Sequence, residues 1–134
     1  MPRPLSVFDI AGRGMAAQMI RLNTTASNMA NAGSVAGSEA AAFRAVKPVF
    51  RTVGDAADTM TIQVDRVTTV TTPPTRRHDP GHPLADRNGD VWEAAVDPTA
   101  EMVEMIEAAR QYQSNVQVME TARTLILDTL RIGK

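Results

Sequence analysis

The chain has 134 residues, of which 43% are hydrophobic but only 4% aromatic, and it contains no cysteine. A hydrophobic content near the globular norm excludes a disordered tail, and the lack of cysteine excludes disulfides, thiolate chemistry and cysteine-ligated metals. The net charge of −1, with arginines scattered along the chain, gives no basic stripe that would favour nucleic acid or an anionic membrane as partner.

The sequence shows neither a membrane span nor a cleaved signal peptide. It has no run of about 20 apolar residues, which a transmembrane helix requires. Residues 1–20 lack the continuous apolar stretch of a secretory signal. These features alone predict a cytosolic protein.

Residues 1–33 predict one helix. Ser6 and Asp9 have the spacing of a capping box, and Gly33 can end the helix. Between them, residues spaced alternately four and three apart form a seam typical of a coiled coil. The seam residues are Phe8, Gly12, Met15, Met19, Leu22, Ala26 and Met29.

The other faces of this helix carry few charges. Asp9, Arg13 and Arg21 are the charged residues between Ser6 and Asn31, and the remainder are small and neutral. Such faces permit further helices to approach closely, whereas a face in water normally carries more charge. A weakly amphipathic helix on one small domain is the alternative.

Residues 34–96 change pattern. Partial alternation from Phe43 to Val53, and clean alternation of Met60, Ile62 and Val64, predict a β-hairpin that turns through residues 54–58. Residues 71–90 hold four prolines and two glycines and predict an irregular segment. Asn88 and Gly89 can turn a short hairpin that leads to Val91 and Trp92.

Residues 97–134 predict a second, longer helix. Asp97 and Pro98 read as its N-cap and first residue, and no glycine or proline interrupts it before Gly133. Roughly 34 residues at about 1.5 Å each give a rod near 50 Å long. Its heptad seam, in which Arg123 is the single polar member, consists of Met102, Met105, Ala109, Tyr112, Val116, Met119, Ile126 and Leu130.

This second helix has more apolar surface than one partner helix would cover. The apolar residues outside its seam are Val103, Ile106, Val118, Ala122, Leu125 and Leu127. The sequence therefore predicts a mainly α fold with a small β region. The two terminal helices would pair as a coiled coil and form one structural unit, with a β-hairpin and an irregular loop inserted between them.

His78 and His82 are the only histidines, and aspartates lie near them. On a helix this spacing of four could supply two metal ligands, as in a small metal-dependent enzyme. Pro80 and Gly81 lie between them and remove that helical geometry. We expect a solvated turn here, with no metal site.

The segment "DRNGDV", residues 86–91, has the alternating oxygen ligands of a calcium loop at Asp86, Asn88 and Asp90. Its glycine stands fourth instead of sixth, and the twelfth position is Asp97 instead of glutamate. The chain also has no glycine-rich phosphate loop, nucleophile elbow or assignable Ser-His-Asp set. The sequence supports neither catalysis nor a cofactor, and it predicts an interaction protein.

Asn28 and Asn31 lie one helical turn apart just before Gly33, and helix termination alone is one interpretation of them. The segment "LNTTASNMANAGS", residues 22–34, also resembles the start of bacterial flagellar axial proteins, whose signature pairs asparagines around a small residue. Asn28, Ala30 and Asn31 match that signature, and Ser34 stands where many members have threonine. The resemblance implies that these asparagines would hydrogen-bond helix ends and adjacent chains together, as well as terminate their own helix.

Further segments narrow the resemblance to the rod subunits of the flagellar basal body. They are "KPVF" (47–50), "DPGHPLAD" (79–86), "VDPTAEMVEMIEAARQYQSNVQVMETA" (96–122) and "LRIGK" (130–134). The resemblance covers essentially the whole chain. Asp90 departs from it, because a tyrosine is expected there.

The resemblance implies a structural subunit of the proximal rod, the drive shaft that crosses the periplasm. The terminal helices would line the inner tube of a helical assembly around the export channel, with the β region outside. The implied partners are further copies, neighbouring rod subunits and the flagellar type III export apparatus, which exports unfolded chains without a cleaved signal. The implied export to the rod replaces the cytosolic prediction made above. Another rod subunit of the same architecture is the alternative assignment. The resemblance implies neither a nucleic-acid partner nor direct insertion into a membrane.

Overall fold

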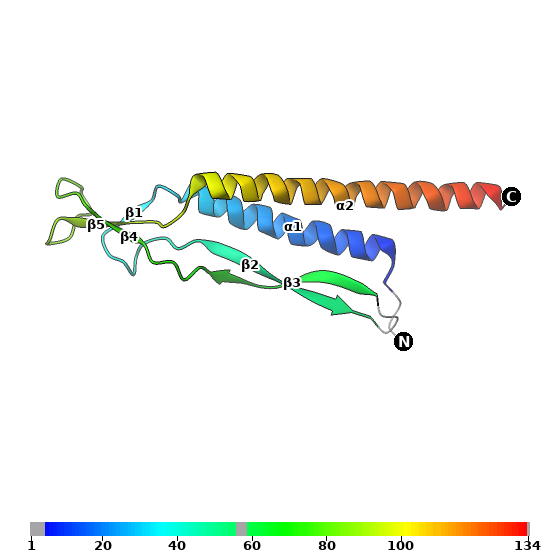
Figure 1. The fold of residues 1–134 in the computed structure, drawn as a ribbon, viewed down its shortest axis with the longest axis horizontal. Helices are drawn as coiled ribbons and strands as arrows, with labels where there is room; N and C mark the ends of the chain where they lie inside the picture. Colours follow the sequence, from blue (N-terminus) through cyan, green and yellow to red (C-terminus); the bar gives the residue numbers. More distant parts are fainter. Residues whose placement is uncertain (1–4, 56–58, 134) are drawn as a thin grey trace.

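The computed structural model describes residues 5–55 and 59–133. The elements along the chain are α1 (Val7–Ala30), β1 (Val35–Ala36), β2 (Val46–Gly54), β3 (Met60–Thr69), β4 (Thr75–His78), β5 (Asp90–Glu93) and α2 (Pro98–Ile132). They form an elongated body in which α1 lies between α2 and the β2–β3 hairpin (Figure 1). The small sheet of β1, β5 and β4 lies beyond the start of α2, at one end of this body.

The predicted capping box at the start of α1 is confirmed. The Ser6 hydroxyl accepts the Asp9 N–H at 3.1 Å, and the Asp9 carboxylate accepts the Ser6 N–H at 2.9 Å. These two bonds satisfy N–H groups that have no partner inside the helix. The helix ends at Ala30 with Asn31 as its C-cap, before the predicted end at Gly33.

The predicted start and end of α2 are confirmed as well. The Asp97 carboxylate accepts the Thr99 N–H at 2.9 Å, Pro98 is the first residue, and Gly133 is the C-cap. α2 runs antiparallel beside α1 (Figure 1). Because α2 has 35 residues and α1 has only 24, the end of α2 continues past the start of α1. Val7, at the start of α1, lies by Thr121 and Ala122. We call residues 123–132 the overhang.

The predicted β2–β3 hairpin is confirmed, with a register that runs from Val46 opposite Thr69 to Gly54 opposite Met60. Residues 56–58 of the predicted turn lie outside the described residues. The Asp55 carboxylate accepts the N–H of Thr59 at 2.9 Å and that of Leu5 at 2.8 Å. It thereby ties the hairpin end to the start of the chain's first helix.

The segment 71–90 was expected to be irregular throughout, and that expectation is wrong, because it contains β4. The predicted strand at Val91 and Trp92 is present as β5, but its partners are β4 and β1. A long loop, residues 79–89, connects β4 to β5 in place of the short hairpin. Gly89 adopts a positive φ of 78° in the turn that enters β5, which glycine tolerates without strain.

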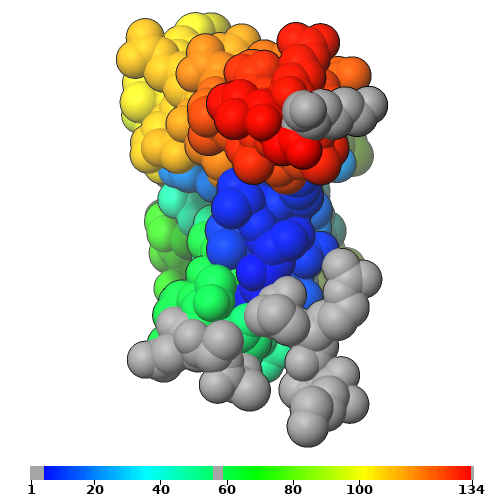
Figure 2. All heavy atoms as spheres, turned by 90° about the vertical axis from the view of Figure 1, so that its right-hand side faces the viewer, coloured from blue at the N-terminus to red at the C-terminus, as the bar shows by residue number. Residues whose placement is uncertain are grey.

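Small residues dominate the core. Among the described residues, the buried hydrophobic ones are Ala11, Ala17, Ala42, Ala45, Val91, Ala94 and Ala108. Because α1 is covered by α2 on one side and by β3 on another, small side chains let the three layers approach closely. The end-on view in Figure 2 shows α2 above α1 and β3 below it. Within the described residues, no helix combines the length and apolar character needed to cross a membrane.

Candidate functional site

A cluster of polar side chains lies where the last turn of α1, the first residue of β2 and the first turn of α2 meet. At its centre, Asn28 is only 1% exposed. Its side-chain amide donates to the Val46 carbonyl at 2.9 Å and to the Glu101 carboxylate at 3.2 Å, and its oxygen accepts the Val46 N–H at 2.9 Å. The carboxamide therefore pairs with Val46 as a neighbouring strand would, and it also binds α2. We call Asn28, Val46 and Glu101 the junction cluster.

Charges on the two helices meet beside this cluster. The Arg21 Nε donates to the Glu104 carboxylate at 3.0 Å, and an Nη atom of Arg21 lies 3.5 Å from the Glu107 carboxylate. Glu101 is 7% exposed and belongs to none of the ion pairs found in the described part of the chain. The most buried carboxylate at this junction thus has a hydrogen-bond donor and stands in the first turn of α2, where the helix dipole favours a negative charge.

A pocket of about 370 Å³ opens next to the junction cluster, and we call it the junction pocket. Its lining combines apolar side chains with charged ones: Arg21, Thr24, Thr25, Asn28, Val46, Lys47, Pro48, Phe50, Glu101 and Glu104.

Asn31 has a different setting from Asn28. Its side-chain amide donates to the Ser27 carbonyl at 2.8 Å, and its own N–H reaches the last carbonyls of α1. Asn31 therefore ends the helix, while Asn28 joins three elements of one chain. Ala30, between them, is exposed. The role of Asn28, Ala30 and Asn31 between chains stays a prediction.

The predicted seam of α1 is only partly covered within one chain. Phe8, Met15, Leu22 and Met29 are half-buried, whereas Met19 is 43% exposed. The residues of α1 that the structure buries are Ala11, Gly14, Ala17, Thr25 and Asn28. The heptad pattern did not identify these buried residues. It assumes that a helix packs against one partner helix, whereas α1 is covered by α2 on one side and by the β2–β3 hairpin on another.

Gly14 lies at a point where α1 and α2 approach closely. A Cβ atom built on Gly14 would lie 2.8 Å from the side-chain nitrogen of Asn115 on α2. The glycine that the seam contained, Gly12, has open space around it. The signal that could have found this contact is the small-residue spacing of Ala11, Gly14 and Ala17.

The predicted seam of α2 divides into a covered middle and exposed ends. Met105, Ala109, Tyr112, Val116 and Met119 are half-buried in the stretch beside α1, while Met102, Ile126 and Leu130 are exposed. The exposed large hydrophobic residues of α2 are Met102, Val103, Ile106, Val118, Leu125, Ile126, Leu127, Leu130 and Ile132. The end of α2, red in Figure 2, faces the viewer beyond α1. A single chain therefore leaves a large apolar surface uncovered along this helix.

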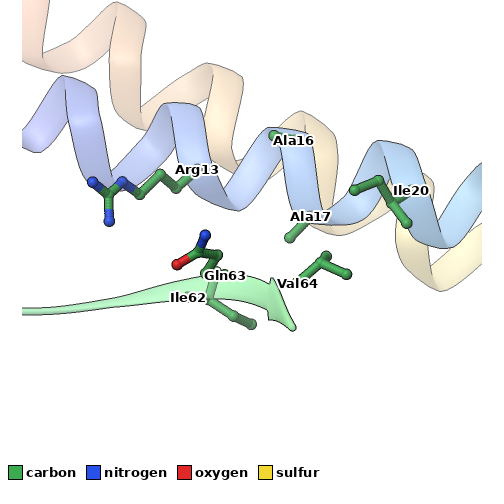
Figure 3. A pocket seen from close by; sticks show the side chains of 7 residues that line it. All are labelled: Arg13, Ala16, Ala17, Ile20, Ile62, Gln63 and Val64. Atoms are coloured by element: carbon green, nitrogen blue, oxygen red, sulfur yellow. The ribbon is translucent and has the colours of Figure 1, made fainter. Parts of the chain in front are cut away.

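A second groove, of about 390 Å³, lies between α1 and β3. Figure 3 shows Arg13, Ala16, Ala17 and Ile20 of α1 above Ile62, Gln63 and Val64 of β3. This lining holds one charged side chain, Arg13, and it offers packing surface without a nucleophile or an acid–base pair.

The two histidines lie in or beside the loop between β4 and β5. The Nδ1 of His78 is 2.9 Å from the Asp90 carboxylate, and the Nδ1 of His82 accepts the Leu84 N–H at 3.1 Å. Asp90 also lies 3.6 Å from Arg76, so it makes local contacts at the position where the resemblance predicts tyrosine. Across residues 5–55 and 59–133, no group of three or more His, Asp or Glu side chains is placed to hold a metal ion.

Asp86 organises the turn before β5. Its carboxylate accepts the N–H of Asp90 at 2.9 Å and that of Asn88 at 2.8 Å. The hydrogen bond from Asp90 is the largest cause that lowers the pKa of Asp86, because it stabilises the charged form. The bond from Asn88 and the charge of Arg76 lower this pKa further.

Comparison with known proteins finds family matches that cover both terminal helices. Residues 8–37 match the family described as flagella basal body rod protein, and residues 87–132 match the family described as flagellar basal body rod FlgEFG protein C-terminal.

Three relatives show how far the similarity extends. The flagellar basal-body rod protein FlgC of Yersinia enterocolitica is 43% identical over 131 residues, which cover 97% of this chain and 98% of the relative. FlgC of Salmonella typhimurium is 43% identical over 133 residues with the same coverage, and FlgC of Aquifex aeolicus is 34% identical over 96% of both chains. By similarity over nearly its whole length, the chain belongs to the FlgC family of flagellar basal-body rod proteins.

Proposed function

We propose that this chain is a structural subunit of the proximal rod of the bacterial flagellar basal body. The names of its relatives support a place in the rod and a structural role in preference to a catalytic one. The observation that carries the proposal is the uncovered apolar surface of α2. Exposed apolar patches of this extent mark interaction sites, and further subunits would cover this one.

The assembly would be built on the terminal parts of the chain. Residues 1–33 and 97–134 would pair as a coiled coil and form the inner layer of a helical tube, with residues 34–96 outside. The antiparallel contact between α1 and α2 supports this arrangement, as does the position of the β2–β3 hairpin on the side of α1 away from α2. A repeated head-to-tail contact that does not close into a ring produces such a helical filament. A tube of this kind would enclose the export channel and transmit torque as a shaft.

The chain would leave the cell unfolded through the flagellar type III export apparatus, without a cleaved signal. A core made mainly of alanine supports this route, because such a core buries little apolar surface and costs little to unfold. Its partners would be further copies of itself and the neighbouring rod subunits.

Purified basal bodies test this proposal. We expect the chain in the rod fraction at a fixed copy number, and we expect its deletion to stop assembly before the distal rod forms. Deletion cells should regain swimming when the full chain is supplied again. Normal rods without the chain, or a chain that is absent from purified basal bodies, would contradict the proposal.

A further inference from the structure

Asn88 and Gly89 form the only Asn–Gly pair in the sequence, and such a pair is chemically reactive. The main-chain nitrogen that follows an asparagine can attack the side-chain Cγ, and glycine has no side chain to hinder that attack. Asn88 is exposed, so water reaches it. The pair is therefore placed for deamidation, which is the hydrolytic loss of the side-chain amide nitrogen.

Deamidation needs no reactant other than water. The Gly89 nitrogen loses its proton and forms a bond to the Asn88 Cγ, and the side-chain amide leaves as ammonia. Water then opens the resulting five-membered succinimide ring at either of its carbonyls. The products are aspartate and isoaspartate, and in isoaspartate the main chain runs through the side-chain carboxyl group.

The fold requires glycine at position 89. Gly89 has a φ of 78°, a conformation that residues with a side chain rarely adopt. A Cβ atom built on Gly89 would also lie 3.0 Å from the Cγ of Pro80 and 3.1 Å from the Cε1 of His78. The glycine that this turn needs therefore makes the preceding asparagine reactive.

Asp86 holds both peptide groups that flank Asn88. The Asn88 N–H donates to the Asp86 carboxylate at 2.8 Å, and the Gly89 N–H donates to the Asp86 carbonyl at 3.0 Å. The Gly89 carbonyl in turn accepts the Asp79 N–H at 2.8 Å. Asn88 is thus the third residue of a closed four-residue turn, and the usual turn types give that residue a ψ of about 0°. Closure of the succinimide ring requires a different ψ, so the turn must open before the reaction.

The charges of the turn oppose the reaction as well. The Gly89 nitrogen must lose the proton that it donates to the Asp86 carbonyl. The Asp86 carboxylate accepts the N–H groups on either side of this nitrogen, those of Asn88 and Asp90. A carboxylate so near disfavours a second negative charge, so the Gly89 nitrogen is harder to deprotonate in the closed turn than in an open chain.

We propose that Asn88 is a deamidation site that the Asp86 turn protects in the folded chain and that reacts when this turn opens. The inference goes beyond the rod function proposed above and does not rest on it, because the reaction depends on the turn alone.

The products of the reaction do not fit the turn. Aspartate at position 88 adds a carboxylate to a turn that already holds those of Asp86 and Asp90. Isoaspartate lengthens the main chain by one methylene group just before β5, where Asp90 lies opposite His78. Both changes oppose closure of the turn, so the modification makes a transient opening lasting.

Peptide mapping by mass spectrometry tests the protection on the full-length chain. The wild-type chain is incubated in mildly alkaline buffer with and without guanidinium chloride, and the products at Asn88 are measured over time. We expect the folded chain to react more slowly by about tenfold or more, because a reaction that needs local opening is slowed by the equilibrium of that opening. Asn31, which precedes an alanine, is the internal control and should react slowly in both conditions. Equal rates at Asn88 with and without denaturant would overturn the proposal.

A pair of substitutions tests the role of Asp86. Asp86→Ala removes the carboxylate acceptor and should accelerate deamidation of Asn88 in native buffer toward the rate in guanidinium chloride. The matched control is Asp79→Ala, which removes a carboxylate that pairs with Arg77 but keeps the main-chain N–H that binds Gly89. It should react at the wild-type rate.

Circular dichroism checks that each variant keeps its fold. A folded Asp86→Ala chain that reacts as slowly as the wild type would overturn the proposal. Equal acceleration by Asp79→Ala would overturn it too, since loss of any nearby charge would then suffice. If Asp86→Ala does not fold, the comparison of the wild-type chain with and without denaturant decides.

Discussion

Asn28 stabilises the single chain because one carboxamide satisfies polar groups on two other elements. It occupies both backbone groups of Val46 and donates to Glu101 as well. Buried backbone groups without partners are costly, and at this position α1 and α2 offer no other side-chain amide in contact with Val46. Asn28, one of the two asparagines that match the family signature, is therefore part of the fold itself.

Asn28→Ala should lower the free energy of unfolding by about 3 kcal/mol, since it leaves two backbone groups and one carboxylate without this partner. Urea unfolding of the purified chain measures the change. Asn31→Ala is the matched control at the more exposed end of α1, where we expect a loss of about 1 kcal/mol or less. Equal losses for the two variants would show that the junction cluster does not stabilise the chain.

The lowered pKa of Asp86 predicts that the stability of the turn before β5 depends on pH. Its pKa in the folded chain lies below the ordinary value of 3.8, so its charged form stabilises the turn above that value, and the contribution is lost as the pH falls through the folded pKa. Hydrogen exchange at the amides of Asn88 and Asp90 should accelerate, relative to the intrinsic rate, as the pH falls below about 3.8. Asp86→Asn should remove this pH dependence, and a wild-type turn that keeps its protection at pH 2 would contradict the assignment.

At the scale of elements, Gly14 lets the backbone of α1 lie against the Asn115 side chain of α2. Gly12→Ala should stabilise the chain by about 0.8 kcal/mol, because its site is open and alanine favours a helix. Gly14→Ala should be less favourable, since its Cβ displaces the Asn115 side chain. Thermal unfolding of both variants, alone and with Asn115→Ala, checks this.

In the Asn115→Ala background we expect Gly14→Ala to stabilise the chain about as much as Gly12→Ala does. If Gly14→Ala stabilised the chain equally well with Asn115 in place, the two helices could not be in close contact at this point.

The elements that the sequence predicted are those with local signals. The helix caps at Ser6 and Asp97 need only residues within one turn, and the alternation in β2 and β3 is visible in the sequence itself. β1 consists of only two residues, and β4 lies in a segment rich in proline, so neither has a pattern of its own. Both form because β5 pairs with them, and that pairing is not local.

The junction cluster could not be predicted from the sequence for the same reason. Asn28 was identified, but its partners lie 18 and 73 residues away. The Arg21–Glu104 contact spans 83 residues. The charges on the two helices are visible in the sequence, but which of them meet depends on the offset between α1 and α2 in the folded chain.

For the whole molecule, the overhang should be the least stable helical part of an isolated chain. It extends past α1, and its large apolar side chains are exposed. Hydrogen exchange of the dilute monomer should be fast in residues 123–132 and slower in residues 98–119, which lie beside α1. In assembled rods the overhang should become protected, because neighbouring subunits stabilise it by mass action. Strong protection of the overhang in a verified monomer would contradict this expectation.

The position of α1 between two layers has a consequence for the order of folding. The layer on one side, β2–β3, is near α1 in sequence, but the layer on the other side is the last helix of the chain. Loop closure over such a separation is slow compared with closure of a local hairpin. A nascent or threaded chain can therefore form α1 with the hairpin early, but it can complete its core only after α2 is free. The order of the elements along the chain therefore delays completion of the core until the last helix is available.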